Sequence, residues 1–369
     1  MTTSNRRPRQ GKIRVLVVDD SAVVRTGLTA ILSADPDFEV QTASDPVLAE
    51  ARTRTFPPDV VILDLEMPRG GGMVFFRRQM QTRPVPVILC SALAGRSAAD
   101  AVEALREGAV ELMEKPRFGI RDFLEEGAVR WRELVRGAAA SHVRAMPPPA
   151  RVPSPATPPP MPGGGEGRET FTSIVAIGAS TGGPEAIERV LRELPADSPP
   201  VVVVQHMPEG YTAAFARRLD GVVGMAVKEA ASGDRLERGR VLVARGDHHL
   251  IVRRHRDRFL VELDHGPRIG HHRPSVDRLF ESVAEVAGDM AIGVLLTGMG
   301  SDGARGLLEL HRRGGHTIVQ DEASAVVFGM PQAAIRLGAA EEVVPLDAVA
   351  GRIGAAVAER PRARAEPSR

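Results

Sequence analysis

Two apolar patterns alternate in the N-terminal part of the chain. Mostly apolar runs, which are typical of strands covered on both faces, occur at residues 13–18, 60–63 and 87–89. Segments with apolar residues at helical spacing occur at residues 23–32, 98–106 and 120–134. This repeated strand–helix alternation predicts an α/β unit built on a doubly wound parallel sheet.

The same alternation resumes in the C-terminal part of the chain. Its strand-like runs lie near residues 174–177, 201–204, 292–296 and 317–319. The stretch 222–263 differs, because short strand-like pieces are interrupted there by Gly and Asp. We therefore expect a second doubly wound parallel sheet, Rossmann-like in its arrangement, with a β-rich insertion.

A segment rich in proline and glycine separates the two patterns. It contains proline triplets at 147–149 and 158–160 and a glycine triplet at 163–165. Such a composition cannot bury a core and favours an extended, semi-rigid linker. We predict a first domain at residues 12–134, a linker at 135–170 and a second domain at 171–358.

Composition narrows the class of partner and the compartment. The 48 Lys and Arg residues nearly balance the 47 Asp and Glu residues, and aromatic residues make up only 4% of the chain. Because a nucleic-acid binder is expected to have a basic patch or stacking aromatics, we predict no nucleic-acid partner. The single cysteine, Cys90, fits a reducing compartment. The sequence has no signal-peptide core and no run long enough to span a bilayer, so we predict a cytoplasmic protein that is not membrane-embedded.

Polar side chains follow the strand-like runs of the first domain. Asp19 and Asp20 follow the first run, and Asp64 follows the second. Carboxylates that converge at one edge of a parallel sheet repel each other without a hard cation, and oxygen ligands suit Mg²⁺. Ser91 and Lys115 follow the next two strands, where a hydroxyl and an ammonium group could bind phosphoryl oxygens. A carboxylate beside a metal can attack a phosphoryl group, so the cluster predicts a phospho-acceptor site rather than five solvated loop residues.

The turn at residues 178–184 reads Gly-Ala-Ser-Thr-Gly-Gly-Pro and follows a predicted strand. A G-x-S-x-G pattern between a strand and a helix is the setting of a nucleophile elbow, here with Ser180 as the nucleophile. Pro184 suits the first turn of a helix, whose N-terminus supplies N–H groups for an oxyanion. Serine is also a common helix N-cap, so this motif alone is a weak signal.

Two further strand ends supply the partners that a serine nucleophile needs. His206 follows the strand at 201–204, and Asp302 follows the strand at 292–296. With Ser180 they would place a nucleophile, a general base and an orienting carboxylate at one sheet edge. The order Ser, His, Asp along the chain differs from that of the α/β-hydrolases, which indicates an independent arrangement of the same chemistry.

Other interpretations of the second domain stay open at this stage. Gly298, Gly300 and Gly303 form a G-x-G-x-x-G pattern after a strand, and Asp321 lies where a dinucleotide fold keeps its ribose-binding acid. Against this reading, Asp302 would put a negative charge where the pyrophosphate should bind. The domain could also be a non-catalytic binding module or a DNA-binding output, although the sequence has no basic helix pair.

Five histidines in or near the insertion are candidate metal ligands. They are His248, His249, His265, His271 and His272. No cysteine accompanies them and they lack a helical His-x-x-x-His spacing, so the case for zinc is weak. We expect solvated loop or substrate-groove residues instead.

The polar cluster of the first domain resembles the signature of response-regulator receivers, over about residues 12–134. The resemblance implies a flavodoxin-like fold with Asp64 as the aspartyl-phosphate site and Ser91 and Lys115 as phospho-switch residues. It implies four Mg²⁺ ligands: Asp19, Asp20, Asp64 and the carbonyl of Glu66. One departure is the glycine run 70–72, where the family often has an Asp before the last glycine; we expect a looser loop there.

Five segments of the second domain resemble the chemotaxis protein-glutamate methylesterase family. They are residues 178–184, 205–208, 273–277, 296–303 and 321–331. Together with the receiver, the resemblance covers nearly the whole chain. It implies that Ser180, His206 and Asp302 are nucleophile, base and acid, and that the oxyanion site involves Thr181 and the backbone near Met299.

The resemblance also implies an activity and its partners. The reaction would be hydrolysis of glutamate γ-methyl esters on methyl-accepting chemoreceptors, a step of chemotactic adaptation, with deamidation of receptor glutamines as a second activity. This is serine carboxylesterase chemistry without a cofactor, and Mg²⁺ would serve only receiver phosphorylation. A chemotaxis histidine kinase would be the phosphodonor, and phosphorylation of Asp64 would displace the receiver from the catalytic cleft.

Overall fold

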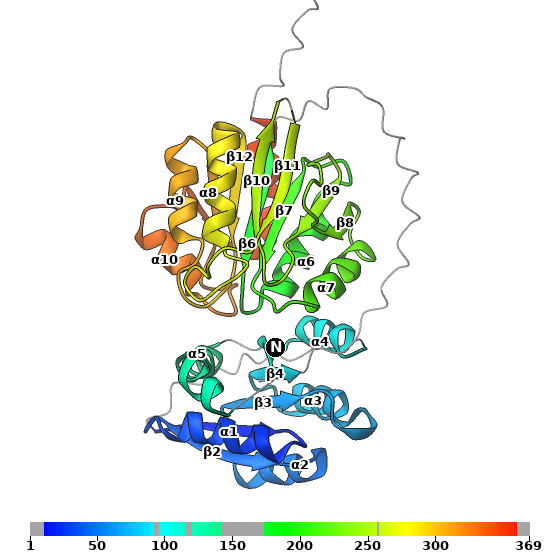
Figure 1. The fold of residues 1–369 in the computed structure, drawn as a ribbon, viewed down its shortest axis with the longest axis vertical. Coiled ribbons are helices and arrows are strands. Elements are labelled where there is room, and N and C mark those ends of the chain that lie inside the picture. The colour runs from blue at the N-terminus through cyan, green and yellow to red at the C-terminus, as the bar shows by residue number, and fades with distance from the viewer. Residues whose placement is uncertain (1–10, 92–95, 116–119, 142–172, 257, 360–369) are drawn as a thin grey trace, which may run out of the picture. The chain divides into compact units, whose positions relative to one another are not determined.

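The computed structural model describes residues 11–91, 96–115, 120–141, 173–256 and 258–359. The chain divides into two compact units, Met1–Ala150 and Arg151–Arg369 (Figure 1). Within the described residues, no helix combines the length and the apolar character needed to cross a lipid bilayer.

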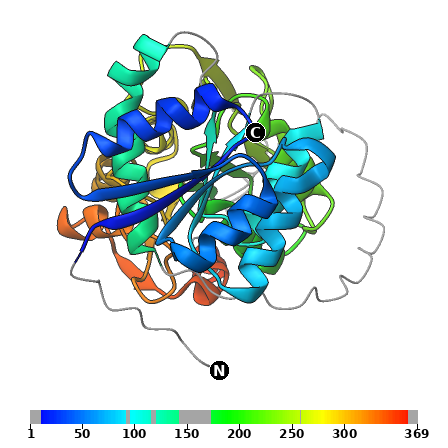
Figure 2. The same ribbon diagram turned by 90° about the horizontal axis from the view of Figure 1, so that it is seen from below.

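The first unit is a five-stranded parallel sheet in the order β2-β1-β3-β4-β5. Its strands are β1 (Ile13–Val18), β2 (Phe38–Ala43), β3 (Val60–Asp64), β4 (Val87–Ser91) and β5 (Glu111–Glu114). Its helices are α1 (Ala22–Ser33), α2 (Pro46–Thr55), α3 (Gly71–Thr82), α4 (Arg96–Arg106) and α5 (Ile120–Ala140). Figure 2 shows α1 and α5 on one face of this sheet and α2, α3 and α4 on the other. The predicted doubly wound parallel sheet is therefore confirmed.

Local sequence explains where several elements of this unit begin. Ser21 caps α1 by accepting a hydrogen bond from the N–H of Val24, and Asp45 caps α2 by accepting one from the N–H of Leu48. The apolar runs of β1, β3 and β4 are almost entirely buried, as strands in the middle of a parallel sheet must be. Strand β2 was not predicted, because it is a half-exposed edge strand with alternating polar residues.

The predicted start of the linker at residue 135 was wrong, because α5 continues to Ala140. Val135 and Ala138 are fully buried, so packing against the unit holds the helix through Gly137. The remainder of the predicted linker, from residue 142 to 170, lies outside the described residues.

The second unit is built on a seven-stranded parallel sheet in the order β14-β13-β12-β6-β7-β9-β8. Its strands are β6 (Ile174–Ala179), β7 (Val201–Gln205), β8 (Ala226–Glu229), β9 (Arg240–Val243), β12 (Ala291–Leu295), β13 (His316–Gln320) and β14 (Glu342–Val344). Its helices are α6 (Gly183–Glu193), α7 (Tyr211–Asp220), α8 (Val276–Ala287), α9 (Ala304–Arg312), α10 (Met330–Arg336) and α11 (Leu346–Ala358). The parallel pairing throughout confirms the second doubly wound sheet.

The predicted β-rich insertion was right in content but wrong in arrangement. Strands β8 and β9 extend the main sheet in parallel with β7, because their buried valine and leucine side chains face its core. Only β10 (His249–His255) and β11 (Arg258–Asp264) form a separate antiparallel hairpin. Runs of four residues broken by glycine do not distinguish a short parallel edge strand from a hairpin strand.

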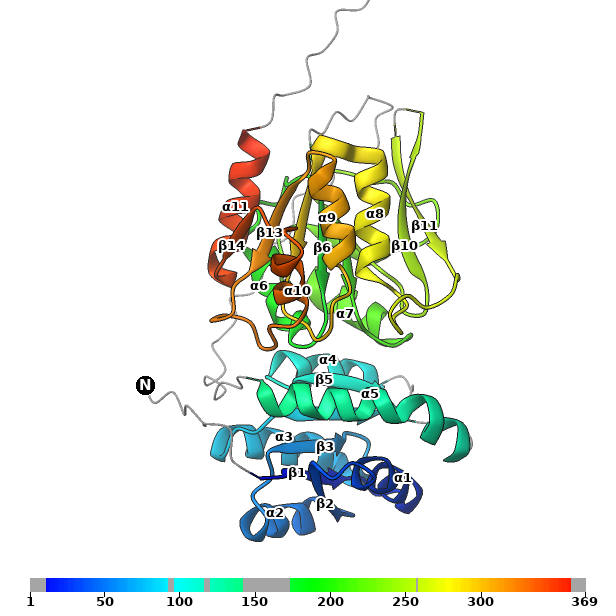
Figure 3. The ribbon, with the colours of Figure 1, turned by 90° about the vertical axis from the view of Figure 1, so that its left-hand side faces the viewer.

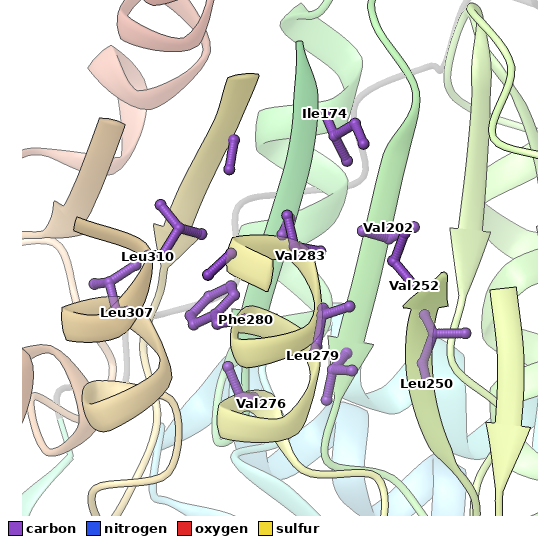
Figure 4. Close-up of a cluster of buried hydrophobic side chains, with 14 of the residues drawn as sticks. Ile174, Val202, Leu250, Val252, Val276, Leu279, Phe280, Val283, Leu307 and Leu310 are labelled. Carbon is purple, nitrogen blue, oxygen red and sulfur yellow. The ribbon is translucent and has the colours of Figure 1, made fainter. Parts of the chain in front are cut away.

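Helix α8 joins the hairpin to the sheet through one apolar core. It packs against α9 on one side and β10 on the other, whereas α6 packs against α11 (Figure 3). Figure 4 shows side chains of β6, β7, β10, α8 and α9 meeting in this core. The labelled members are Ile174, Val202, Leu250, Val252, Val276, Leu279, Phe280, Val283, Leu307 and Leu310. This packing fixes the N-terminus of α8 against the carboxyl ends of the central strands.

Candidate active site and phospho-acceptor site

The predicted nucleophile lies on a rigid turn between β6 and α6. Ser180 is buried, its N–H donates to the carbonyl of Thr297 at 3.0 Å, and its own carbonyl accepts from the N–H of Gly183 at 2.7 Å. Gly182 has a φ of 76°, and a Cβ there would lie 2.6 Å from Val326. Only glycine fits this left-handed, closely packed position, so the sequence of the turn dictates its sharpness.

A buried glutamine joins the nucleophile turn to the neighbouring strand end. Gln205 closes β7, and its side-chain amide donates to the carbonyl of Ser180 at 2.9 Å and to that of His206 at 3.1 Å. The N–H of His206 donates to the carbonyl of Ala179 at 3.1 Å. Ser180 and His206 therefore stand on adjacent, mutually bonded strand ends. Sequence reasoning assigned no role to Gln205, because its two contacts are made only in the folded sheet.

Asp302 is the best-satisfied polar side chain of the site. Its Oδ2 lies 2.7 Å from His206 Nε2 and accepts the N–H of Val276 at 2.7 Å. Its Oδ1 accepts the hydroxyl of Ser275 at 2.8 Å and the N–H of Asp277 at 3.1 Å. These donors form the N-terminus of α8, where a negative charge is stabilised. Burial opposes ionisation, but the hydrogen bond and charge of His206 together with the backbone N–H groups lower the pKa of Asp302 to about 2.

The ionised state of Asp302 determines which nitrogen of His206 carries the proton. Because a carboxylate only accepts hydrogen bonds, Nε2 must be the protonated nitrogen of the neutral ring. Nδ1 then holds a lone pair, and it is buried without a hydrogen-bond partner among the described residues. A buried, unpaired ring nitrogen beside a serine turn is chemically suited to accept a proton.

The predicted oxyanion residues lie on both sides of Ser180. Thr181 is next along the turn, and its carbonyl accepts from the hydroxyl of Thr297 at 2.9 Å. Met299 follows Gly298, where a Cβ would lie 2.9 Å from the Cβ of Ser180. In the part of the chain that the structure describes, the N–H of Met299 donates to no protein acceptor. This segment therefore offers a backbone donor close to the nucleophile.

The five predicted phospho-acceptor residues lie at the carboxyl ends of β1, β3, β4 and β5. Asp19, Asp20 and Asp64 each offer a carboxylate oxygen, and the three oxygens lie within 4.8 Å of one another. Lys115 Nζ forms ion pairs with Asp64 Oδ2 at 2.7 Å and with Asp19 Oδ2 at 3.0 Å. The angles at these contacts do not meet the geometry of a hydrogen bond. Burial raises the pKa of Asp64, and the Lys115 ammonium opposes that rise. Burial lowers the pKa of Lys115, but the carboxylates of Asp64 and Asp19 outweigh it and raise that pKa.

Ser91 and Glu66 lie beside this cluster. The Ser91 hydroxyl donates to Glu66 Oε1 at 3.4 Å, and the N–H of Glu66 donates to Asp64 Oδ1 at 2.8 Å. The side chain of Glu66 is exposed, so it adds no fourth buried carboxylate. A Cβ at Gly72 would lie 2.4 Å from the carbonyl oxygen of Asp64, which explains a glycine at the start of α3.

Of the five histidines, His265 and His271 are exposed, as expected for solvated loop residues, but His249 is not. His249 is buried, donates through Nε2 to the carbonyl of Pro267 at 3.0 Å and accepts the N–H of Ser275 through Nδ1 at 3.2 Å. His265 pairs with Asp247 at 3.2 Å. Among the described residues, the one group of three or more possible metal-ligating side chains with converging atoms is the aspartate cluster. No zinc site is therefore supported in that part of the chain.

The dinucleotide interpretation is not supported by the contacts of its acidic residues. Asp302 is buried against the N-terminus of α8, where it holds His206. Asp321 accepts the N–H and the hydroxyl of Ser324 at 3.0 and 2.6 Å, which closes its own loop. Asp302 therefore occupies the helix end where a pyrophosphate would bind, and Asp321 already has partners within its own loop.

The fold and the two sites define a two-domain response regulator whose output unit carries a serine, a histidine and a carboxylate at one sheet edge. Residues 15–125 match the response regulator receiver domain, and residues 175–353 match the CheB methylesterase family. The chain belongs to the protein-glutamate methylesterase/protein-glutamine glutaminase family and is an enzyme of that family.

Curated relatives resemble this chain over nearly its full length. A protein-glutamate methylesterase/protein-glutamine glutaminase from Rhodospirillum rubrum is 49% identical and covers 93% of this chain and 98% of its own. Another, from Anaeromyxobacter dehalogenans, is 51% identical and covers 91% and 94%. The crystal structure of the Thermotoga maritima CheB methylesterase catalytic domain is 40% identical, covers 49% of this chain and 96% of its own, and has a TM-score of 0.48.

Proposed function

We propose that this chain hydrolyses glutamate γ-methyl esters on methyl-accepting chemoreceptors and deamidates receptor glutamines with a Ser180, His206, Asp302 triad. The observation that carries the proposal is the 2.7 Å contact between His206 Nε2 and Asp302 Oδ2, beside the serine turn, at three adjacent strand ends. The names of relatives about half identical to this chain support the substrate class.

In the first half-reaction, Ser180 Oγ attacks the side-chain carbonyl carbon of the esterified glutamate. His206 Nδ1 accepts the serine proton, because Nε2 already donates to Asp302. The imidazolium that forms is stabilised by the Asp302 carboxylate. When the tetrahedral intermediate collapses, Nδ1–H gives its proton to the leaving methoxide, and methanol departs. With a glutamine substrate the leaving group is ammonia.

The second half-reaction returns the enzyme to its resting state. His206 Nδ1 takes a proton from a water molecule, and the hydroxide oxygen attacks the carbonyl carbon of the acyl-serine. The serine–carbonyl bond breaks, and the proton returns from Nδ1 to Ser180 Oγ. The glutamic acid product loses its remaining proton to solvent and leaves as a carboxylate. No group besides the triad, water and backbone donors is used.

Oxyanion stabilisation is assigned to backbone donors on both sides of Ser180. The N–H of Met299, which has no protein acceptor among the described residues, is one candidate donor. The turn at Thr181 and the positive N-terminus of α6 would stabilise the oxyanion from the other side of Ser180. A single such donor is worth about 3 kcal/mol in comparable sites.

The first unit is proposed to accept a phosphoryl group on Asp64 from a chemotaxis histidine kinase. Asp19, Asp20 and Asp64 fit a Mg²⁺ ion, because three carboxylate oxygens converge there and the buried Oδ2 atoms of Asp19 and Asp64 receive no hydrogen bond from the described residues. The carbonyl of Glu66 is the fourth proposed ligand. When bound, Mg²⁺ would neutralise charge on the phosphoryl oxygens. Lys115 then holds one of those oxygens, and Ser91 hydrogen-bonds another as the switch.

Phosphorylation is proposed to raise the esterase activity of the second unit. A phosphoryl group adds negative charge between Lys115 and Ser91 and draws the Ser91 hydroxyl away from Glu66, its hydrogen-bond acceptor in this structure.

The location proposed for the protein is the cytoplasm. The buried Cys90 forms no disulfide, which fits a reducing compartment.

Removal of the nucleophile tests the catalytic assignment. We predict that Ser180→Ala abolishes methanol release from a methyl-esterified chemoreceptor fragment, because the variant lacks the hydroxyl that attacks the ester carbonyl. The free energy of unfolding, measured by thermal denaturation, should stay within about 1 kcal/mol of that of the parent. Ser232→Ala, at an exposed serine of the same unit, serves as the matched control and should retain full activity. A Ser180→Ala variant that still releases methanol refutes the triad.

A further inference from the structure

The catalytic base has an aromatic neighbour that sequence reasoning did not connect to it. The rings of His206 and His272 are parallel within 6°, and their centroids lie 3.7 Å apart. This is a full face-to-face contact between a buried ring and a half-buried one. Asp302 holds one edge of the His206 ring, and His272 covers its face.

A tight turn places His272 in this position. The N–H of Ile269 donates to the carbonyl of His272 at 3.0 Å, and the N–H of His272 donates back to Ile269 at 2.9 Å. The two central residues, Gly270 and His271, have φ values of 55° and 70°. Positive φ at both positions is the geometry of a two-residue hairpin turn of type I′. His272 therefore leaves the turn with a fixed backbone.

An ion-pair anchor holds the next residue. Arg273 donates through Nε and Nη2 to Asp247 Oδ1 at 3.1 and 2.8 Å, and through Nη1 to the carbonyl of Gly266 at 2.8 Å. Arg268, from the same loop, also reaches Asp247 Oδ1 at 2.9 Å. Although burial raises it, the hydrogen bonds from Arg273 and His265 keep the pKa of Asp247 below its usual value. The loop is tied to the body of the unit at the residue beside His272.

From this geometry we propose that His272 is a positioning residue that fixes the ring plane of the catalytic base. The carboxylate of Asp302 restrains Nε2 but leaves the ring able to tilt about the hydrogen bond. The stacked ring removes that freedom and holds Nδ1 in one position beside the serine turn. This inference rests on the proposed role of His206 in the triad.

Three substitutions at position 272 separate stacking from other roles. His272→Phe keeps a flat aromatic face, His272→Gln keeps hydrogen-bonding groups without a ring, and His272→Ala removes both. The matched control is His271→Asn, an exposed neighbour where asparagine tolerates the positive φ. All variants are made in the full chain, and thermal unfolding verifies that they fold.

The readout is the rate at which a small fluorophosphonate labels Ser180, with kcat and KM for methanol release measured alongside. Labelling does not depend on the receptor substrate. We expect His272→Ala and His272→Gln to label about ten- to hundredfold more slowly, with a matching loss in kcat and little change in KM. His272→Phe should stay within about threefold of the parent, and His271→Asn should equal it.

Each other outcome counts against the inference. Equal labelling of the alanine variant and the parent means that the stack does not position the base. Full activity of the glutamine variant with loss in the phenylalanine variant means that His272 acts through a polar contact and not through its ring. A parent protein that is not labelled at all refutes the triad itself, and that result is distinguishable from the first two.

Discussion

At the residue scale, the molecule is most restricted where a backbone passes close to a reacting side chain. A Cβ at Gly72 would lie 2.4 Å from the Asp64 carbonyl oxygen and 2.6 Å from the Cα of Leu65. We predict that Gly72→Ala destabilises the first unit by about 1–3 kcal/mol, because backbone atoms cannot move aside as a flexible side chain can. Trp131, the single tryptophan, is fully buried in this unit, so its fluorescence during urea unfolding of the full chain measures the change.

Gly70→Asn is the matched control for that substitution. Gly70 has a φ of 68°, but nothing lies within 4 Å of the position of its Cβ. Asparagine tolerates that φ, so this variant should unfold close to the parent midpoint. Equal midpoints for Gly72→Ala and the parent would contradict the close approach.

Ser275 connects a helix cap to the catalytic acid. Its hydroxyl caps α8 by accepting the N–H of Arg278 and donates to Asp302 Oδ1 at 2.8 Å. We predict that Ser275→Ala destabilises the protein by about 1–2 kcal/mol and lowers kcat, because Asp302 loses one hydrogen bond to its charged form. Asp45→Ala removes the cap of α2 in the other unit and should destabilise without lowering basal kcat. Unchanged kcat in Ser275→Ala would show that the hydroxyl serves the helix alone.

At the element scale, the N-terminus of α8 makes the second unit sensitive to acid. Although burial opposes ionisation, the contacts with His206 and the backbone N–H groups at this helix end lower the pKa of Asp302 from its ordinary value of 3.8 to about 2. A carboxyl group whose folded pKa is depressed contributes stability above its unfolded pKa and loses it as the pH falls through the folded pKa. We therefore predict that the second unit loses stability between about pH 5 and pH 2, as measured by hydrogen exchange in peptides from α8.

Asp302→Asn provides the comparison for this pH dependence. Without the ionisable group, the acid-dependent loss of protection in α8 should be smaller, although the variant is less stable at neutral pH. An identical acid profile in the variant and the parent would assign the effect to other carboxylates.

The elements that the sequence predicts best are strands that are buried on both faces of a sheet. Strands β1, β3, β6 and β7 are mostly apolar runs, as expected for strands that are buried on both faces. The edge strands β2 and β14 were missed, because half-exposed edges carry mixed sequences. Helix α5 was predicted too short, since its end depends on packing rather than on a stop signal.

The residues of the candidate sites also differ in how well the sequence predicts them. Residues at the carboxyl ends of strands, such as Asp64, Ser180 and His206, were predictable because parallel strands share one edge. Contacts made by loops from distant elements were not. The stack of His272 on His206 depends on a turn after β11 and on an anchor at Asp247, which no local pattern indicates.

At the scale of the whole molecule, both units place functional side chains at the carboxyl edge of a parallel sheet. The first unit places carboxylates and an ammonium group at one sheet edge, and the second places a serine, a histidine and a carboxylate at another. Phosphoryl chemistry at the first edge is proposed to control acyl transfer at the second. The central claim is therefore that one chain couples the two chemistries.

The most direct test is methanol release from a methyl-esterified chemoreceptor fragment, with and without Mg²⁺ and a small-molecule phosphodonor. It is run on the parent, on Asp64→Asn, and on Asp37→Asn, which makes the same charge change at an exposed carboxylate. We predict that phosphodonor raises the rate of methanol release for the parent and for Asp37→Asn. For Asp64→Asn, the rates with and without phosphodonor should be equal. Stimulation that persists in Asp64→Asn, or no methanol release from the parent in either condition, would contradict the account.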